Sequence, residues 1–168
     1  MPNPNLDAEA LYQVLSERVR AGLAQAEQVA IVGIYSGGAW LAERLAKELQ
    51  LDERLGFIDV SFYRDDYAEK GLHAEVKPTQ IPFDVEGATI LLVDDVLYTG
   101  RTTRAAINEL FDYGRPARIM LAALVDRGGR ELPIAADFVA ESVSLASDEH
   151  LVLQRAADGR FSFTVEHA

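Results

Sequence analysis

Cysteine is absent from all 168 residues of this chain, so disulfide bonds and thiolate-based zinc sites are excluded. No apolar stretch approaches the roughly 18 residues that a membrane-spanning helix needs. The first residues also lack the basic segment followed by an apolar one that a secretory signal would show. We therefore expect a cytoplasmic protein without a membrane segment.

Basic residues are also scarce: 16 Lys and Arg stand against 27 Asp and Glu, which gives a formal net charge of −11. Such a chain offers nucleic acid no general electrostatic attraction, although a local basic patch is still compatible with it. The remaining composition, 49% hydrophobic and 26% charged, is ordinary for a globular protein. At this length we predict a single domain over residues 1–168.

The most informative stretch combines an apolar run, two carboxylates and a hydroxyl-rich loop. Residues 88–93 are apolar apart from Thr89 and are followed directly by Asp94 and Asp95. A Thr-Gly-Arg-Thr loop at 99–102 then leads into a helical pattern over 103–111. A continuous aliphatic run indicates a strand buried on both faces, as in parallel sheets covered by helices. We predict that this strand ends at residue 93, with the two aspartates at its carboxyl end.

That edge is where open α/β sheets bind ligands, and the N-terminus of the following helix offers backbone N–H groups to an anion. The loop residues 99–103 therefore fit a phosphate cradle. Composition alone equally allows a strand-end turn with threonine helix caps, which strand-to-helix connections use routinely.

The other segments repeat this plan. Apolar spacings of three and four predict helices over 7–23 and 39–49. Apolar or β-branched runs predict strands over 28–34, 55–62, 118–125 and 137–140. The tail alternates in polarity on either side of Asp158-Gly159, which indicates an antiparallel hairpin of 151–154 with 161–165. Residues 63–87 lack periodicity and are interpreted as an active-site lid or hairpin. The predicted fold is α/β: a mostly parallel sheet flanked by helices, with an appended antiparallel hairpin.

Residues 93–102, Val-Asp-Asp-Val-Leu-Tyr-Thr-Gly-Arg-Thr, closely resemble the phosphoribosyl-pyrophosphate (PRPP) motif of the type I phosphoribosyltransferases. Residues 124–134, together with 62–66 and 96–98, narrow the resemblance to a family of bifunctional pyrimidine-operon regulators and uracil phosphoribosyltransferases. The similarity runs from about Leu6 to Val165.

The resemblance implies a reaction in which uracil displaces pyrophosphate from PRPP and gives UMP. Positive charge then develops on the ribose, so positioning and electrostatics should dominate over nucleophilic catalysis. Carboxylates accept hydrogen bonds from ribose hydroxyls, and Mg²⁺ is the expected cofactor, because it bridges phosphate oxygens with few protein ligands. Asp94 and Asp95 are accordingly expected as catalytic residues that also orient the metal, directly or through water. PRPP and its phosphate are assigned to Tyr98, Thr99, Gly100, Arg101, Thr102 and Thr103.

The same resemblance places uracil beside Val125, Asp126 and Arg127, whose alternative interpretation is a surface ion pair in a turn. Arg64, at the start of the predicted lid, is a third catalytic candidate that could reach pyrophosphate, or else an ordinary solvent-exposed charge. Arg101 has the same alternative.

The pyrophosphate loop is expected at Tyr35, Ser36, Gly37 and Gly38, and here the chain departs from the family. The usual loop carries a lysine and an arginine around a threonine, whereas this chain has Tyr35 and Gly37 at the two cationic places. Backbone N–H groups remain to face an anion. We hypothesise that Gly37→Arg would tighten pyrophosphate binding.

Three functions remain open: a uracil phosphoribosyltransferase, a UMP-sensing RNA-binding attenuation regulator, and a phosphoribosyltransferase for another base. The expected small-molecule partners are PRPP, uracil and UMP, and the resemblance implies a homodimer or tetramer. A pyrimidine-operon mRNA leader would need a cluster of basic side chains, for which the candidates are Arg18, Arg20, Arg127, Arg130 and Arg155. The three histidines, His73, His150 and His167, lie at no ligand or triad spacing and receive no role.

Overall fold

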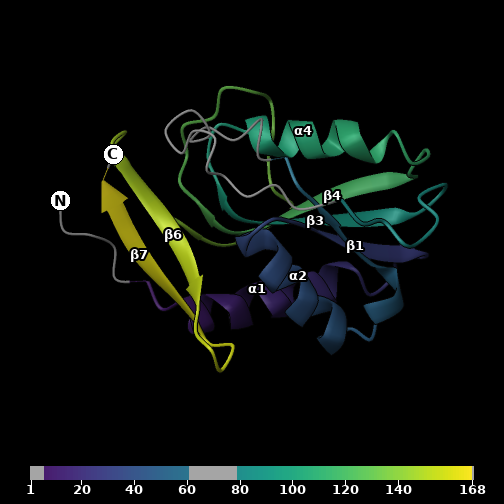
Figure 1. Cartoon of the computed structure of the whole chain (residues 1–168), viewed down its shortest axis with the longest axis horizontal. Coiled ribbons are helices and arrows are strands. Elements are labelled where there is room, and N and C mark those ends of the chain that lie inside the picture. Colours follow the sequence, from purple (N-terminus) through teal and green to yellow (C-terminus); the bar gives the residue numbers. More distant parts are fainter. Residues whose placement is uncertain (1–5, 61–78, 168) are drawn as a thin grey trace.

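A computed structural model describes residues 6–60 and 79–167. Its centre is a five-stranded sheet in the order β2-β1-β3-β4-β5, and every neighbouring pair is parallel. The strands are β1 (Val29–Ile34), β2 (Leu55–Ile58), β3 (Thr89–Leu97), β4 (Arg118–Asp126) and β5 (Phe138–Ser142). The helices α1 (Ala8–Gly22) and α2 (Gly37–Glu48) cover one face and α4 (Arg101–Leu110) the other, with a short 3₁₀ turn at Asp52–Arg54 (Figure 1).

Alternate strand residues supply two separate cores, because successive side chains of a strand point to opposite faces. The first core joins α1 and α2 to residues such as Ile31, Leu91 and Leu124. The second joins α4 to residues such as Ile90 and Leu92. Both faces of the sheet are therefore buried, as the unbroken apolar runs predict.

The strands β6 (Glu149–Arg155) and β7 (Phe161–His167) form a separate antiparallel hairpin. Its apolar side completes the first core with Leu151, Leu153 and Phe161. Arg44 of α2 stacks on the Phe161 ring at 3.8 Å and forms an ion pair with Glu9 at 2.9 Å. The Glu9 carboxylate also accepts the Phe161 N–H at 2.7 Å, so one network fastens the hairpin to both helices.

The predicted α/β architecture is confirmed, with shifted boundaries. The helix expected over 39–49 begins at Gly37, and the one expected over 103–111 begins at Arg101. The strand expected over 55–62 ends at Ile58, where its pairing with β1 ends. Most of the lid predicted over 63–87, Arg64 included, lies outside the described residues. Residues 81–87 form no helix or strand, and Gln80 makes an isolated bridge to Phe57.

The prediction that the central strand ends at residue 93 was wrong. β3 continues to Leu97 because β4 goes on pairing with it, from Asp94 opposite Ala123 to Leu97 opposite Asp126. Leu97, beyond the two carboxylates, is buried in the second core and so also holds the end of β3 in place. On its other edge β3 pairs with β1 only as far as Val93. Asp94 and Asp95 thus lie just beyond the end of the β1–β3 pairing, while the opposite edge of β3 is still paired with β4.

Among residues 6–60 and 79–167, no helix has the length and apolar character required to cross a membrane.

Candidate active site at the β1–β3 crevice

The strand order places a topological switch point between β1 and β3. From β1 the chain moves outward to β2 in one direction, and the later strands β3, β4 and β5 follow in the other. The loops that leave β1 and β3 therefore diverge and leave a crevice at the carboxyl edge, where α/β sheets bind ligands. The described candidate residues for substrate lie along this edge, in β3 and β4, in the connections that follow β1, β3 and β4, and in the first turns of α2 and α4.

On the β1 side, residues 35–38 lead straight into α2. The Tyr35 ring packs on Phe57 of β2, with ring centroids 5.4 Å apart. Burial, followed by the charges of Glu43 and Asp59, raises the pKa of Tyr35 above its usual value. Ser36 is the N-cap of α2, and its side chain makes no capping hydrogen bond. The Ser36 hydroxyl therefore does not cap the N-terminus of α2.

The start of α2 lies directly against the acidic pair. A Cβ atom added to Gly37 would lie 2.3 Å from the Asp95 Oδ2 atom and 2.8 Å from its Cγ. A Cβ on Gly38 would lie 2.3 Å from the Val93 carbonyl oxygen. Glycine is thus required here by close approach. This geometry argues against the expected gain from Gly37→Arg, because any side chain at this position would displace Asp95.

The two carboxylates are held by local hydrogen bonds. Asp94 is 8% exposed, and its Oδ1 accepts the Asp95 N–H at 2.9 Å. The Asp95 Oδ1 accepts the Val96 N–H at 2.8 Å. One oxygen of each carboxylate therefore accepts a hydrogen bond from the neighbouring backbone N–H, which orients the group.

Residues 98–103, which comprise the connection after β3 and the first residues of α4, are called the phosphate loop. Gly100 has φ +95° and is the N-cap of α4, and the Arg101 N–H donates to Thr99 Oγ1 at 3.2 Å. The Thr103 hydroxyl is buried, and no hydrogen-bond partner for it exists within the described part of the chain. A buried hydroxyl without a partner is costly, and a helix N-terminus attracts anions. Both features fit a phosphate at the start of α4.

Residues 126–134, the last residue of β4 and the loop that follows it, are called the base loop. The Asp126 carboxylate accepts the Gly128 N–H at 2.9 Å and an Arg130 N–H at 2.6 Å. Burial by itself raises the pKa of Asp126, but its hydrogen bonds with Arg130 and Gly128 and the charge of Arg130 outweigh that effect and lower it. The Asp126 carboxylate is therefore bonded to other groups of the base loop.

The Arg127 side chain is bonded to other parts of the protein. It is 7% exposed and donates to the carbonyl oxygens of Glu149, at 2.7 Å, and Ala146, at 3.0 Å. Its guanidinium also stacks on the Tyr98 ring at 3.8 Å. A base beside this loop would therefore meet backbone groups of residues 125–128, while the Arg127 side chain faces the β5–β6 connection.

Comparisons with known proteins point to one family. A model of the phosphoribosyl transferase domain matches residues 6–150. A protein named Bifunctional protein PyrR from Ralstonia nicotianae is 57% identical, over 99% of this chain and 98% of its own. One of the same name from Pseudomonas aeruginosa is 51% identical, over 91% and 89% respectively.

The chain belongs to the PyrR family of phosphoribosyl transferase proteins.

Solved structures agree on the fold. A hypoxanthine phosphoribosyltransferase from Staphylococcus aureus superimposes with a TM-score of 0.64 at 23% identity, covering 84% of this chain and 78% of that one. A hypoxanthine-guanine phosphoribosyltransferase from Bacillus anthracis gives 0.63 at 18% identity, covering 82% and 79%. The fold of this PyrR-family chain is thus that of the type I phosphoribosyltransferases.

Two residues that sequence reasoning did not assign to the site stand out in the base loop. Arg130 bonds to three partners in and around the loop, and Glu131 forms an ion pair with Arg101 at 2.9 Å. Both lie in the Asp-Arg-Gly-Gly-Arg-Glu run at 126–131. The available signal was the presence of both charge signs within this short run, in which Asp126 and Arg130 pair.

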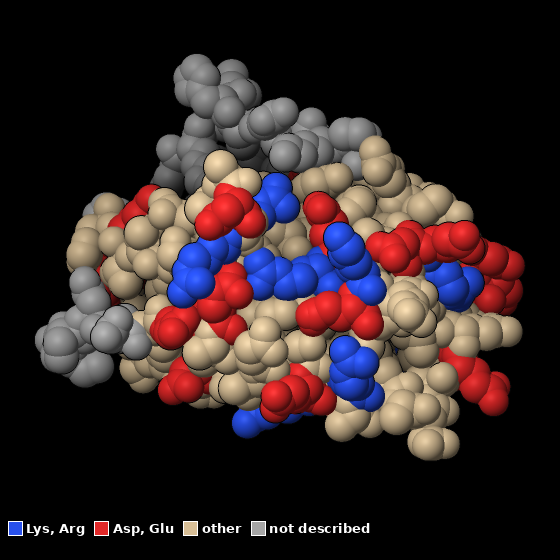
Figure 2. Space-filling view, turned by 90° about the horizontal axis from the view of Figure 1, so that it is seen from below, with Lys and Arg blue, Asp and Glu red and all other residues tan. Residues whose placement is uncertain are grey.

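The five arginines suggested for RNA binding are largely engaged with other parts of the protein. Arg127 and Arg130 bond internally, Arg18 donates to the Val139 carbonyl oxygen, and Arg155 stacks on the Trp40 ring at 4.9 Å. Figure 2 shows the α1 and α2 face, on which blue side chains are interspersed with red ones. This face presents mixed charge rather than one basic field.

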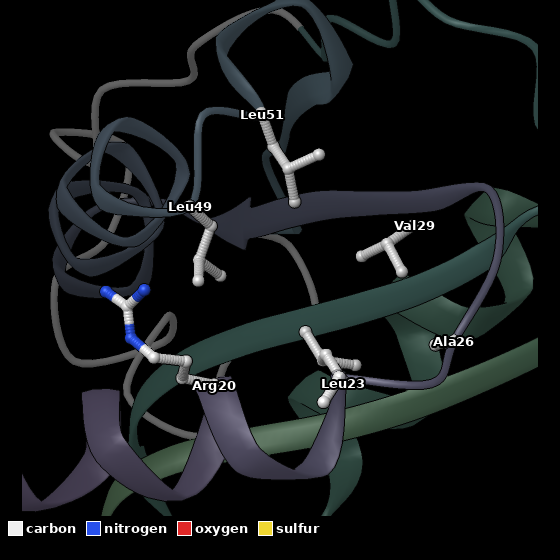
Figure 3. A pocket seen from close by; sticks show the side chains of 7 residues that line it. Arg20, Leu23, Ala26, Val29, Leu49 and Leu51 are labelled. Carbon is white, nitrogen blue, oxygen red and sulfur yellow. The ribbon is translucent and has the colours of Figure 1, made fainter.

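The fifth arginine, Arg20, lies beside an apolar hollow of about 400 Å³ (Figure 3). The other lining residues are Leu23, Ala24, Ala26, Val29, Leu49 and Leu51. Val29 is the first residue of β1, so this hollow lies at the amino edge of the sheet, opposite the crevice. A second hollow of about 470 Å³ is lined by residues 144–146, 148, 149 and His167, behind the base loop.

Proposed function

We propose that this protein is a uracil phosphoribosyltransferase that makes UMP and pyrophosphate from uracil and PRPP. The observation that carries the proposal is the meeting of three elements at one crevice. The start of α2 lies against Asp95, the strand that carries the acidic pair leads through residues 98–100 into α4, and the Thr103 hydroxyl is buried without a protein partner in the described structure. The name of the PyrR relatives and the matched domain support the same reading.

In this reaction the bond between ribose C1′ and the pyrophosphate oxygen breaks, the bond to uracil N1 forms, and the N1 proton is released. Positive charge on the ribose ring is the feature to be stabilised. Asp94 and Asp95 would accept hydrogen bonds from the ribose hydroxyls and bring negative charge close to that ring. One oxygen of each carboxylate already accepts a backbone N–H. The two carboxylates therefore need less reorganisation when substrate binds.

The phosphate loop would hold the ribose phosphate through the N-terminus of α4, the Thr102 and Thr103 side chains and Tyr98. The start of α2, residues 35–38, would face pyrophosphate with backbone N–H groups, and Arg64 remains a candidate for the same group. Uracil has one N–H between two carbonyls, so backbone groups beside Val125, Asp126 and Arg127 can recognise it without an ionisable side chain.

Mg²⁺ fits the donor set at this crevice. Asp94 and Asp95 supply hard oxygen atoms, and the residues that the structure describes hold no group of three or more potential metal ligands. Two carboxylates plus substrate oxygens is the usual arrangement for Mg²⁺. When bound, the ion would neutralise charge on the pyrophosphate. The same proposal includes a cytoplasmic location and a homodimer or tetramer.

The test is product formation: purified protein, PRPP and uracil are incubated with and without Mg²⁺, and UMP is quantified by chromatography. Hypoxanthine and guanine serve as competing bases, because another base specificity is the nearest alternative. UMP formed only with uracil and Mg²⁺ is the expected result. Formation of a purine nucleotide instead would overturn the assignment of the base.

A second role, regulation of pyrimidine genes through leader RNA, is favoured by one observation, the word "bifunctional" in the names of the relatives. The net charge of −11 and the internal bonds of Arg127 and Arg130 oppose it. If RNA binds, it must use a limited patch.

A further inference from the structure

We infer that Arg130 is a positioning residue that locks the base loop to the phosphate loop, so that the two halves of a nucleotide are bound as one unit. The inference rests on the proposed function and deepens it. Arg130 lies in the base loop, and its partly buried guanidinium has partners in both loops.

One guanidinium joins three backbone or side-chain groups. Arg130 Nη1 donates to the Tyr98 carbonyl oxygen at 2.7 Å, and Nη2 donates to Asp126 Oδ2 at 2.6 Å. Nε donates to the Ile134 carbonyl oxygen at 2.8 Å. The first bond crosses to the phosphate loop, and the other two close the base loop on itself. A planar, forked group is suited to such simultaneous bonding, whereas a lysine ammonium is not.

Backbone contacts run beside this bridge. The Thr99 carbonyl oxygen accepts two N–H groups of the base loop, from Glu131 at 2.9 Å and from Leu132 at 3.2 Å. The Arg127 guanidinium stacks on the Tyr98 ring, and a Cβ added to Gly129 would lie 2.5 Å from that ring. The residue before the phosphate-binding threonines is thus held by the base loop through its ring and its carbonyl group.

This arrangement determines how ligands should respond when the lock is removed. UMP contacts both loops and needs them at one fixed separation. Ribose 5-phosphate contacts only the phosphate loop, so it is insensitive to where the base loop lies. If Arg130 sets the relative placement, its loss should weaken UMP binding much more than ribose 5-phosphate binding. If Arg130 only supports the phosphate loop, both ligands should weaken equally.

The experiment measures the affinity of the full chain for UMP and for ribose 5-phosphate by calorimetry, in the wild type and in Arg130→Met. Methionine keeps apolar bulk and removes every donor. We expect UMP to bind about tenfold more weakly, as for the loss of one charge-assisted hydrogen bond, and ribose 5-phosphate by less than about threefold. Equal losses for the two ligands, or no loss for UMP, would overturn the inference.

Three further variants sharpen the result. Asp126→Asn keeps an acceptor for the Gly128 N–H but weakens the hold on Arg130, so it should reproduce the selective loss even if Arg130→Met folds poorly. Arg130→Lys keeps the charge and should not restore UMP affinity, whereas full rescue would show that charge alone matters. Arg118→Met removes an exposed arginine at the amino end of β4 and should change neither affinity.

The two possible failures are distinguishable. A wild-type protein that binds neither ligand defeats the proposed function, and the inference falls with it. A wild-type protein that binds both, with variants that lose them in parallel, defeats only the coupling of the loops.

Discussion

The two sides of the crevice are built differently. On the β1 side, residues 35–38 are Tyr, Ser and two glycines, and α2 approaches Asp95 so closely that a side chain at position 37 has no room. On the β3–β4 side, Arg101, Arg127 and Arg130 join the loops by an ion pair, a ring contact and hydrogen bonds. The side proposed for ribose phosphate and base is braced, whereas the side proposed for the leaving group depends on backbone and close packing.

The acidic pair lies between these sides, and its loss should have the largest effect. We expect Asp94→Asn combined with Asp95→Asn to lower kcat/KM for PRPP about 100-fold or more, because two acceptors of charge-assisted hydrogen bonds are neutralised. Steady-state kinetics measure this, and urea unfolding should show that the variant remains folded. Unchanged kinetics would remove both residues from the site.

Close packing on the β1 side gives the next effect. Gly37→Ala should lower kcat/KM about tenfold, because the new methyl group displaces the Asp95 carboxylate and weakens its hydrogen bonds. The same substitution in an Asp95→Ala background should cost much less, since the group that it displaces is gone. An equal cost in both backgrounds would show that Gly37 acts through something other than Asp95.

A cation added to the β1 side tests whether charge is limiting there. Tyr35→Lys should lower KM for PRPP by about threefold and lower the Mg²⁺ concentration required, because an ammonium supplies part of the missing charge. Tyr35→Leu is the control, since it also removes the ring contact with Phe57 and adds no charge. If the leucine variant behaves in the same way, the cation is not the cause.

The β3–β4 side of the crevice has arginines, but most of their N–H donors bond to other groups of the protein. We therefore expect pyrimidine-operon leader RNA to bind more weakly than about micromolar near 0.15 M salt, where the Debye length is about 8 Å. Filter binding over a salt series measures this. Nanomolar binding to arbitrary RNA would show that a basic surface exists despite the net charge of −11.

The smallest expected effect is on acid stability. The pKa of Asp126 lies below its ordinary value, so its contribution to folding is present above about pH 4 and is lost as pH falls through the lowered pKa. Between pH 5 and pH 3 the wild type should therefore lose up to about 1 kcal/mol more stability than Asp126→Asn. Urea unfolding at both pH values measures the difference. An identical loss in both proteins would mean that the Arg130 pair adds no stability.

Sequence reasoning predicted the parallel sheet because its strands are apolar on both faces, and it predicted the hairpin from the alternating tail around Asp158-Gly159. It missed the last residues of β3, since carboxylates inside a strand look like the end of one. The pairing with β4 that carries the strand onward is a tertiary contact.

The burial of Arg127 could not be predicted for a related reason. A charged residue in a polar loop is normally exposed, and only the fold brings the carbonyl groups of Ala146 and Glu149 to it. The crowding at Gly37 likewise depends on how α2 meets β3 in space, which no spacing along the chain encodes.

The hairpin β6–β7 has a consequence for how the protein forms during synthesis. The second core, under α4, uses strands and a helix that all precede the hairpin in chain order. The first core lacks Leu151, Leu153 and Phe161 until the hairpin has been made. As a chain emerges from the ribosome at about 5–20 residues per second, one face of the sheet can therefore close while the other still exposes α1 and α2 apolar groups. During that interval the unclosed face is the part of the nascent chain most open to chaperones and to aggregation.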